Sequence, residues 1–181
     1  PYIWQGGMAI QGGIIFACIA AYFYLKKHQI PVLPFADTVT PGIILGQAIG
    51  RIANFMNGDA FGHPTGQDFG LLYPDTTLAY HTYGAQPLWP AEVWECQGDL
   101  LIFVLLLWYG CKTRAEGTTF CLYIMFYSLL RFFLENYRGD YGTLALGLKS
   151  AQLTSLAAFA GAFILFLYFH FKHKSKSGIS E

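Results

Sequence analysis

The chain has 181 residues and a formal net charge of zero; 54% of its residues are apolar, 18% are aromatic and 12% are charged. Soluble domains carry about 25% charged residues, so this composition predicts an integral membrane protein whose surface contacts the lipid bilayer. Zero net charge argues against a nucleic-acid partner, because phosphates favour a basic protein face. The cysteines lie in or at the ends of apolar segments without metal-ligand spacing, which predicts free thiols and no metal site; they are Cys18, Cys96, Cys111 and Cys121.

Five apolar segments approach the roughly 20 residues that a helix needs to cross the hydrocarbon layer. In chain order they cover residues 8–25, 35–56, 91–110, 118–137 and 150–171. Residues 58–90 are rich in Gly, Pro, Thr, Asp and Tyr, which predicts a loop. We therefore expect the all-α class. The predicted fold is a polytopic transmembrane helix bundle of about five spans, in a single domain over residues 1–181, with a long outer-face loop at about 58–90.

Clusters of positive charge give the expected orientation, because short cytoplasmic loops carry an excess of Lys and Arg. These clusters follow the first, third and fifth segments and lie at Lys26–Lys27, at Lys112 with Arg114, and at residues 172–176. Five alternating spans bring all three to one face, which predicts a cytoplasmic C-terminus and an outer N-terminus. Arg51 and Arg131 lie at the outer ends of the second and fourth segments and break this pattern. A charge in or near a span has a functional role by default.

Polar residues at helical spacing form three stripes that reach the expected outer face. The stripes consist of Arg51, Asn54 and Asn57 on the second segment, of Glu92, Glu95 and Asp99 on the third, and of Arg131, Glu135 and Arg138 on the fourth. A guanidinium group binds phosphate in a bidentate manner and stays charged in surroundings of low dielectric constant. We expect Arg51 to face Arg131 and Glu135, next to Asn54, in a site for an anionic group.

The stripes also have structural interpretations. Arg131 with Glu135 alone is typical of a structural ion pair. Glu92 and Glu95 are equally compatible with solvated side chains at the mouth of the third helix, whereas Asp99 lies too deep for solvation. These alternatives stay open on the sequence alone.

Three motifs resemble the prolipoprotein diacylglyceryl transferase family. They are Trp4-Gln5-Gly6-Gly7-Met8-Ala9-Ile10-Gln11-Gly12-Gly13, then Gly50-Arg51-x-x-Asn54-Phe55-x-Asn57-Gly58-Asp59-x-x-Gly62, and then Arg131-x-x-x-Glu135-x-x-Arg138. They occur in the order that the family has and extend over most of the chain, from about residue 4 to 171. The resemblance implies a seven-span enzyme of the bacterial inner membrane, with its N-terminus outside and its C-terminus in the cytoplasm. The five predicted spans are similar to the last five of the seven, so we expect this chain to be an N-terminally truncated portion.

The resemblance also implies a reaction and its partners. The diacylglyceryl group of phosphatidylglycerol passes to the lipobox cysteine thiol of a prolipoprotein signal peptide, which forms a thioether and releases glycerol phosphate, with no metal or other cofactor. The implied partners are therefore phosphatidylglycerol, the prolipoprotein and the lipid bilayer. The matching positions imply catalytic roles for Asn54, Asp59, Arg131 and Glu135. They imply phosphatidylglycerol binding for Arg51, Asn57, Gly62, Arg138 and Gln11.

Three departures from the family pattern affect the expected chemistry. Gln11 stands where many members have a histidine that is proposed as a base, and glutamine accepts no proton at neutral pH. Asp59 replaces the more usual glutamate. The motif His-Pro-x-Gln-x-Tyr-Glu is Trp89-Pro90-Ala91-Glu92-Val93-Trp94-Glu95 here, which keeps only Pro90 and Glu95. We expect Arg51, with Arg131 or Arg138, to clamp the lipid phosphate, and Asp59 or Glu135 to assist removal of the thiol proton.

Two other functions fit a small membrane protein with charges gathered at one end. In a transporter or channel, the converging charges would line a permeation path. The position of the charges at the outer end argues against that function. A non-catalytic scaffold or inactive paralogue is the second alternative, and Gln11 is the residue that suggests it.

Overall fold

Five long helices make up most of this computed structural model, which describes the backbone of residues 10–111, 115–139 and 149–177 and the side chains of residues 12–111, 115–139 and 149–172. The long helices are α1 (Ile10–Lys27), α2 (Val32–Asn57), α4 (Ala91–Gly110), α5 (Thr118–Leu134) and α6 (Ser150–Ser177). A short helix α3 (Leu78–Tyr83) and a 3₁₀ turn η2 (Glu135–Tyr137) complete the set. The predicted all-α helix bundle is confirmed, and the described residues contain isolated β-bridges rather than strands.

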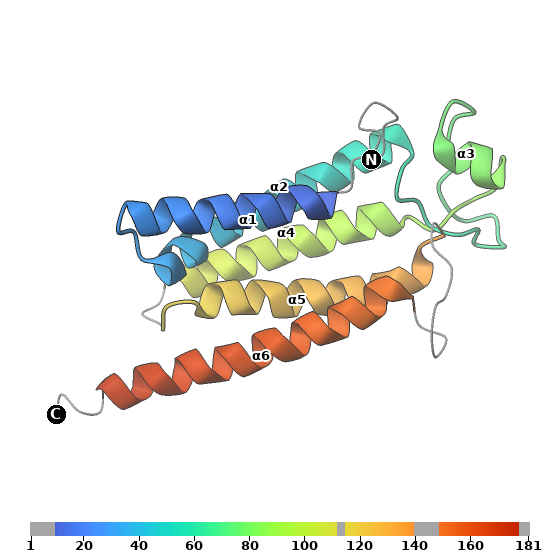
Figure 1. The fold of residues 1–181 in the computed structure, drawn as a ribbon. Helices are drawn as coiled ribbons and strands as arrows, with labels where there is room; N and C mark the ends of the chain where they lie inside the picture. Colours follow the sequence, from blue (N-terminus) through green and yellow to red (C-terminus); the bar gives the residue numbers. More distant parts are fainter. Residues whose placement is uncertain (1–9, 112–114, 140–148, 178–181) are drawn as a thin grey trace.

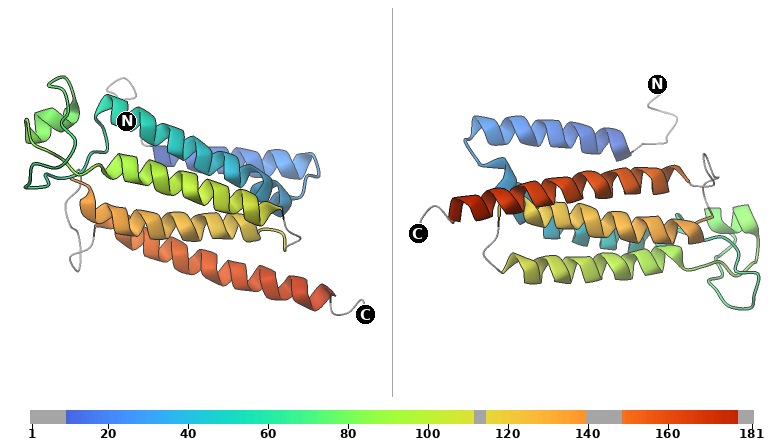
Figure 2. Two further views of the ribbon diagram at one scale, coloured as in Figure 1. Left: turned by 180° about the vertical axis from the view of Figure 1, so that it is seen from behind. Right: turned by 90° about the horizontal axis from the view of Figure 1, so that it is seen from below.

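The bundle consists of α2, α4, α5 and α6, while α1 lies to one side (Figures 1 and 2). The most extensive packing joins α5 to α6 and α2 to α4, and α1 makes its few contacts mainly with α2. Ile44 of α2 packs with Ile102 and Leu106 of α4 in the core.

The surface of the bundle is apolar, which suits a membrane. Large side chains such as Phe16 on α1 and Ile164 on α6 are 74% and 66% exposed, an arrangement that soluble proteins avoid over wide areas. By length and composition, three stretches are able to cross a membrane, namely Val32–Asn57, Thr118–Tyr137 and Ser150–Lys172. The protein is therefore a membrane protein, whereas the count of five spans stays a prediction.

One end of the bundle carries the segment between α2 and α4, and we call it the loop end. The C-termini of α2 and α5 and the N-termini of α4 and α6 meet there, next to α3 (Figure 1). Residues 58–90 are not entirely a loop, because Thr77 begins α3 by accepting a hydrogen bond from the Tyr80 N–H. The segment has its own small core of Phe61, Ala79 and Leu88.

The opposite end of the bundle is held by a side chain that caps a neighbouring helix. Asp37 of α2 is 8% exposed, and its carboxylate accepts hydrogen bonds from the backbone N–H groups of Gly117 (2.7 Å) and Phe120 (2.9 Å). These N–H groups lie at the N-terminus of α5, where no intrahelical acceptor is available. The contact fixes the position of α2 relative to α5, and thereby helps to fix the residues that both helices carry at the loop end.

Replacing Asp37 with alanine should therefore lower the free energy of unfolding by about 2 kcal/mol, the value of a lost helix cap with a charged acceptor. Denaturant-induced unfolding of the purified protein in detergent measures the change. Thr38→Ala is the control, since Thr38 is the exposed neighbour of Asp37 on the same helix. Equal stability of Asp37→Ala and the parent would show that the cap contributes little.

Candidate active site

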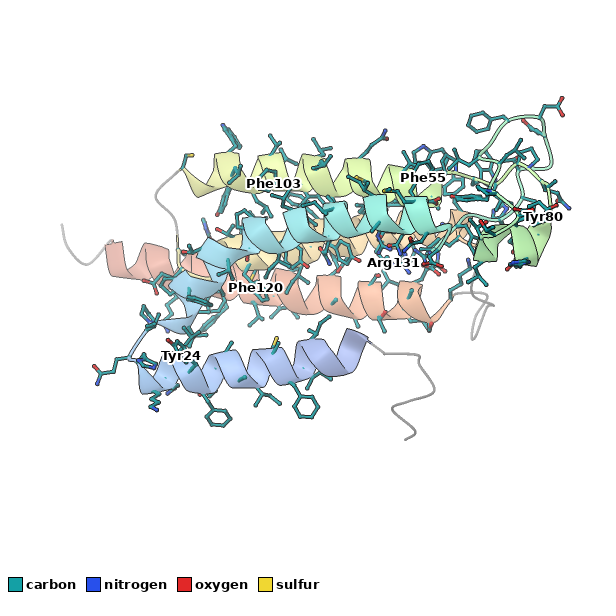
Figure 3. The ribbon with its side chains drawn as sticks, turned by 90° about the horizontal axis from the view of Figure 1, so that it is seen from above. Tyr24, Phe55, Tyr80, Phe103, Phe120 and Arg131 are labelled. Carbon is teal, nitrogen blue, oxygen red and sulfur yellow. The ribbon has the colours of Figure 1, made fainter. Side chains whose placement is uncertain are left out.

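Glu95 is the centre of a buried group of charges at the loop end. Its side chain is 1% exposed, and Arg51 Nη2 lies 2.7 Å from Glu95 Oε1. Arg131 Nη1 and Arg138 Nη1 each lie 3.5 Å from Glu95 Oε2. Guanidinium groups from α2, from α5 and from the residue after η2 thus converge on one carboxylate of α4. Figure 3 shows Arg131 among the side-chain nitrogen and oxygen atoms next to the loop end.

A second carboxylate, that of Glu135, lies beside this centre. Arg131 Nη2 lies 2.8 Å from Glu135 Oε2, one helical turn away. Lys149 Nζ lies 4.0 Å from Glu135 Oε1 and donates hydrogen bonds to the backbone carbonyl oxygens of Glu135 (2.7 Å) and Arg138 (2.6 Å). Lys149 therefore holds the end of η2, where the chain turns to present Arg138. We call Arg51, Glu95, Arg131, Glu135 and Arg138 the arginine cluster.

The arginine cluster has more donors than its two carboxylates can accept. Each guanidinium carries five N–H donors, whereas a carboxylate offers about four acceptor positions. Two of the three contacts to Glu95 are long, and Arg51 adds a weak hydrogen bond of 3.4 Å to Asn54 Oδ1. Buried cations are stable only when anions or acceptors surround them. The side chains of Arg51 and Arg131 are 20% and 14% exposed, so a further anion can reach them, and a guanidinium group is able to bind phosphate in a bidentate manner.

Two further carboxylates of α4 are buried beside the arginine cluster. Glu92 and Asp99 are both 0% exposed, so the solvated alternative for Glu92 and Glu95 is wrong. The cause is packing, because α2 and α5 both contact α4 and cover its polar stripe. In the part of the chain that the structure describes, neither carboxylate has a hydrogen-bond partner.

The structure brings together five of the nine predicted site residues, namely Arg51, Asn54, Arg131, Glu135 and Arg138. Arg51 reaches its neighbours through Glu95, whereas Glu135, expected to face Arg51, is paired with Arg131 and Lys149.

Of the other four predicted residues, three lie at the edge of the site, and the side chain of one is outside the described residues. Asp59 and Arg138 both line a pocket of about 430 Å³ that Leu78 and Thr82 of α3 help to enclose. Asn57 is exposed at the end of α2, so its contact with a ligand stays a prediction. Gln11 belongs to α1, and its side chain lies outside the described residues.

Gly62, the fourth of these residues, allows the loop to approach Arg138 closely. It is buried and forms an antiparallel bridge with Arg138, flanked by hydrogen bonds from the N–H of His63 to the Tyr137 carbonyl (3.0 Å) and from the N–H of Gly139 to the Phe61 carbonyl (3.2 Å). A Cβ atom at Gly62 would overlap the carbonyl oxygen of Trp89. Only glycine fits this position without a shift of the loop backbone.

Gly62→Ala should therefore displace the loop from Arg138 and lower both stability, by about 1–3 kcal/mol, and activity. Thermal unfolding in detergent measures the first effect. Gly50→Ala is the control, because a Cβ atom on that helical glycine meets nothing within 4 Å. Unchanged stability of Gly62→Ala would contradict the tight packing described.

Two residues of the site were given no role by the sequence analysis, namely Glu95 and Lys149. Glu95 stands in a polar stripe together with Glu92 and Asp99, and the presence of three acids in an apolar helix was its available signal. Lys149 had no such signal, because its role depends on where α6 begins relative to η2. Among the described residues, no three His, Cys, Asp or Glu side chains are grouped so that they could hold a metal ion.

Comparisons with known proteins agree on one family. The sequence profile of the prolipoprotein diacylglyceryl transferases matches residues 1–168. The chain is similar to proteins named phosphatidylglycerol–prolipoprotein diacylglyceryl transferase from three bacteria. Identity is 34% over 169 residues for Halalkalibacterium halodurans (92% of this chain, 58% of the relative), 39% over 165 residues for Nostoc sp. (87% and 58%), and 38% over 177 residues for Clostridioides difficile (97% and 66%). The chain thus spans less than two thirds of the length of these relatives.

Proposed function

Because this chain belongs to the prolipoprotein diacylglyceryl transferase family, we propose that its arginine cluster serves the reaction for which its relatives are named. The diacylglyceryl group of phosphatidylglycerol is transferred to a cysteine thiol of a prolipoprotein, which forms a thioether and releases glycerol phosphate. The observation that carries the proposal is the convergence of three guanidinium groups on the single buried carboxylate of Glu95.

In the proposed mechanism, Arg51, Arg131 and Arg138 hold the lipid phosphate. Sulfur attacks the terminal carbon of the diacylglyceryl group, the bond from that carbon to the phosphate oxygen breaks, and glycerol phosphate leaves with the electron pair. Fixed positive charge near the departing phosphate stabilises the transition state, and it does so strongly where water is excluded.

The acidic and amide groups of the site have supporting roles in this mechanism. Glu95 keeps the three guanidinium groups together, and Glu135 orients Arg131. Asn54, in contact with Arg51, is placed to hydrogen-bond the lipid head group. Asn57, Gly62 and Gln11 complete the proposed binding residues.

The proposed setting is the bacterial inner membrane, with the loop end facing outward and the C-terminus in the cytoplasm. The position of Lys26 and Lys27 at the end of the bundle opposite the loop end supports this orientation. The lipobox cysteine of a prolipoprotein signal peptide would then reach the arginine cluster from the outer side. The proposed partners of the protein are phosphatidylglycerol, the prolipoprotein and the surrounding bilayer.

Mass spectrometry of a lipobox peptide tests this proposal. The complete protein is incubated with the peptide and with vesicles that contain phosphatidylglycerol. We expect the peptide mass to increase by one diacylglyceryl group and an equal amount of glycerol phosphate to be released. A peptide with serine in place of the cysteine is the control. Absence of the adduct would contradict the proposal, and solute flux into the vesicles without an adduct would favour the transporter alternative.

A further inference from the structure

Glu92 is a buried carboxylate whose structural role is unexplained by its surroundings. It lies in the first turn of α4 and is 0% exposed, and neither of its oxygen atoms has a hydrogen-bond partner among the described residues. Burying a carboxylate without a partner is unfavourable unless it binds a proton or a ligand. The charged groups close enough to act on it are Arg138 after η2, Arg51 on α2 and Glu95 on its own helix. Glu92 lies one helical turn before Glu95 on the same face of α4, so it is next to the carboxylate that the three arginines share.

The other carboxylates of this end of the protein are either paired with arginines or lie farther from the proposed phosphate position. Glu95 is shared by three arginines, and Glu135 is paired with Arg131 and approached by Lys149. Asp99 also has no hydrogen-bond partner in the described part of the chain, but it lies seven residues further along α4, about 10 Å deeper in the bundle. Asp59 lines the open pocket at the loop end. Glu92 is the buried carboxylate that lies nearest the loop end with both oxygens unengaged among the described residues.

We propose that Glu92 accepts the proton of the substrate cysteine thiol, an inference that rests on the proposed function. The S–H bond breaks as its proton passes to a Glu92 oxygen, and the sulfur electron pair forms the bond to the diacylglyceryl carbon. The carbon–oxygen bond to the phosphate breaks in the same displacement, and the proton on Glu92 then passes to the released glycerol phosphate or to water. Arrival of the anionic phosphate favours proton uptake, because it adds negative charge beside Glu92.

The test compares single-turnover rates of thioether formation for the complete protein and its variants at saturating phosphatidylglycerol. Glu92→Gln should lower the rate at pH 7 by about 10²- to 10⁴-fold, the usual contribution of a general base. Its remaining rate should increase about tenfold per pH unit up to about pH 8.5, where the pKa of a free thiol lies and solution thiolate replaces the missing base. The parent should show a weaker dependence on pH over this range. Binding of phosphatidylglycerol should change little, because the arginines are intact.

Asp99→Asn is the matched control, since Asp99 is equally buried on the same helix and, among the described residues, also has no hydrogen-bond partner. It should leave the rate and the pH profile close to those of the parent. The inference is overturned if Glu92→Gln keeps the rate and pH profile of the parent, or if Asp99→Asn reproduces both effects of Glu92→Gln. It is also overturned if Asp59→Asn or Glu135→Gln shows the high-pH recovery and Glu92→Gln does not.

Two further results separate failure of the proposed function from failure of the role of Glu92. If the parent forms no adduct at all, the proposed function fails and the role of Glu92 fails with it, whereas an active parent with an unaffected Glu92→Gln refutes the role of Glu92 alone. If Glu92→Gln does not fold, the rate and pH profile of Glu92→Asp test the role of Glu92 instead. A shortened carboxylate should lower the rate about tenfold to a hundredfold through misplacement while it preserves the pH profile of the parent. An unchanged rate in Glu92→Asp would overturn the inference.

Discussion

Arg51→Ala should lower the rate of diacylglyceryl transfer by about 10²- to 10³-fold, the effect of removing one preorganised group that stabilises developing negative charge. Arg51 makes the shortest contact with Glu95, 2.7 Å, so its loss both removes a proposed phosphate ligand and frees the Glu95 carboxylate, which would then repel the phosphate. The loss should be largest at limiting phosphatidylglycerol. Quantitative mass spectrometry of the modified lipobox peptide over time measures the rate.

Two variants separate this role from an effect of charge alone. Arg51→Lys keeps the positive charge but loses the planar fork, so it should recover only part of the activity. Lys27→Ala removes an exposed cation at the opposite end of the bundle and should behave like the parent. Near-normal turnover of Arg51→Ala at limiting phosphatidylglycerol would contradict a phosphate-binding role for this residue.

Glu95→Gln should have the largest effect on stability. The substitution leaves three guanidinium groups around a neutral amide, and removing one partner from a buried ion pair lowers the free energy of unfolding by about 3–5 kcal/mol. Thermal or denaturant-induced unfolding of the complete protein in detergent measures the change. Phosphatidylglycerol should recover part of the lost stability, because a bound phosphate supplies the missing anion and ligands that bind the native state stabilise it.

Gln97→Ala provides the control for Glu95→Gln, since Gln97 is exposed on the same helix two residues away. It should change the unfolding midpoint little. If Glu95→Gln unfolds at the midpoint of the parent with or without phosphatidylglycerol, Glu95 does not hold the arginines together.

The helices of the bundle were largely predictable, because they follow from the length of the apolar segments and from the proline, glycine and charged residues at their ends. The sequence predicts a helix over residues 91–110, and α4 covers Ala91–Gly110, directly after Pro90, which has no backbone N–H to extend a helix from the preceding residues. The second helix begins at Val32 rather than at residue 35, because Pro34 is tolerated in a first turn, where its N–H is not needed. Helix α3 has only six residues, too few for hydrophobic periodicity to appear, and the cap at Thr77 was its sole local signal.

The site was less predictable, because pairing depends on how the helices are rotated against one another. Helical spacing placed Arg131 and Glu135 on one face, and the ion pair between them follows from that spacing. Spacing within α4 gave no indication that Glu95, rather than Glu135, meets Arg51. The position of Lys149 against the carbonyl oxygens of Glu135 and Arg138 arises from the contact between α6 and α5, which no local pattern encodes.

The measurement that tests the phosphate-binding claim most directly is a magnetic-resonance distance between the lipid phosphorus and arginine side-chain nitrogen. Complete protein with ¹⁵N-labelled arginine, reconstituted with phosphatidylglycerol, is studied by solid-state NMR with ³¹P–¹⁵N dipolar recoupling. We predict measurable ³¹P–¹⁵N coupling, because guanidinium nitrogens that donate hydrogen bonds to the phosphate lie about 2.8 Å from its oxygen atoms. Part of this coupling should be lost in Arg51→Lys. Parent protein that transfers the diacylglyceryl group while its arginines show no coupling to the lipid phosphorus would contradict the claim.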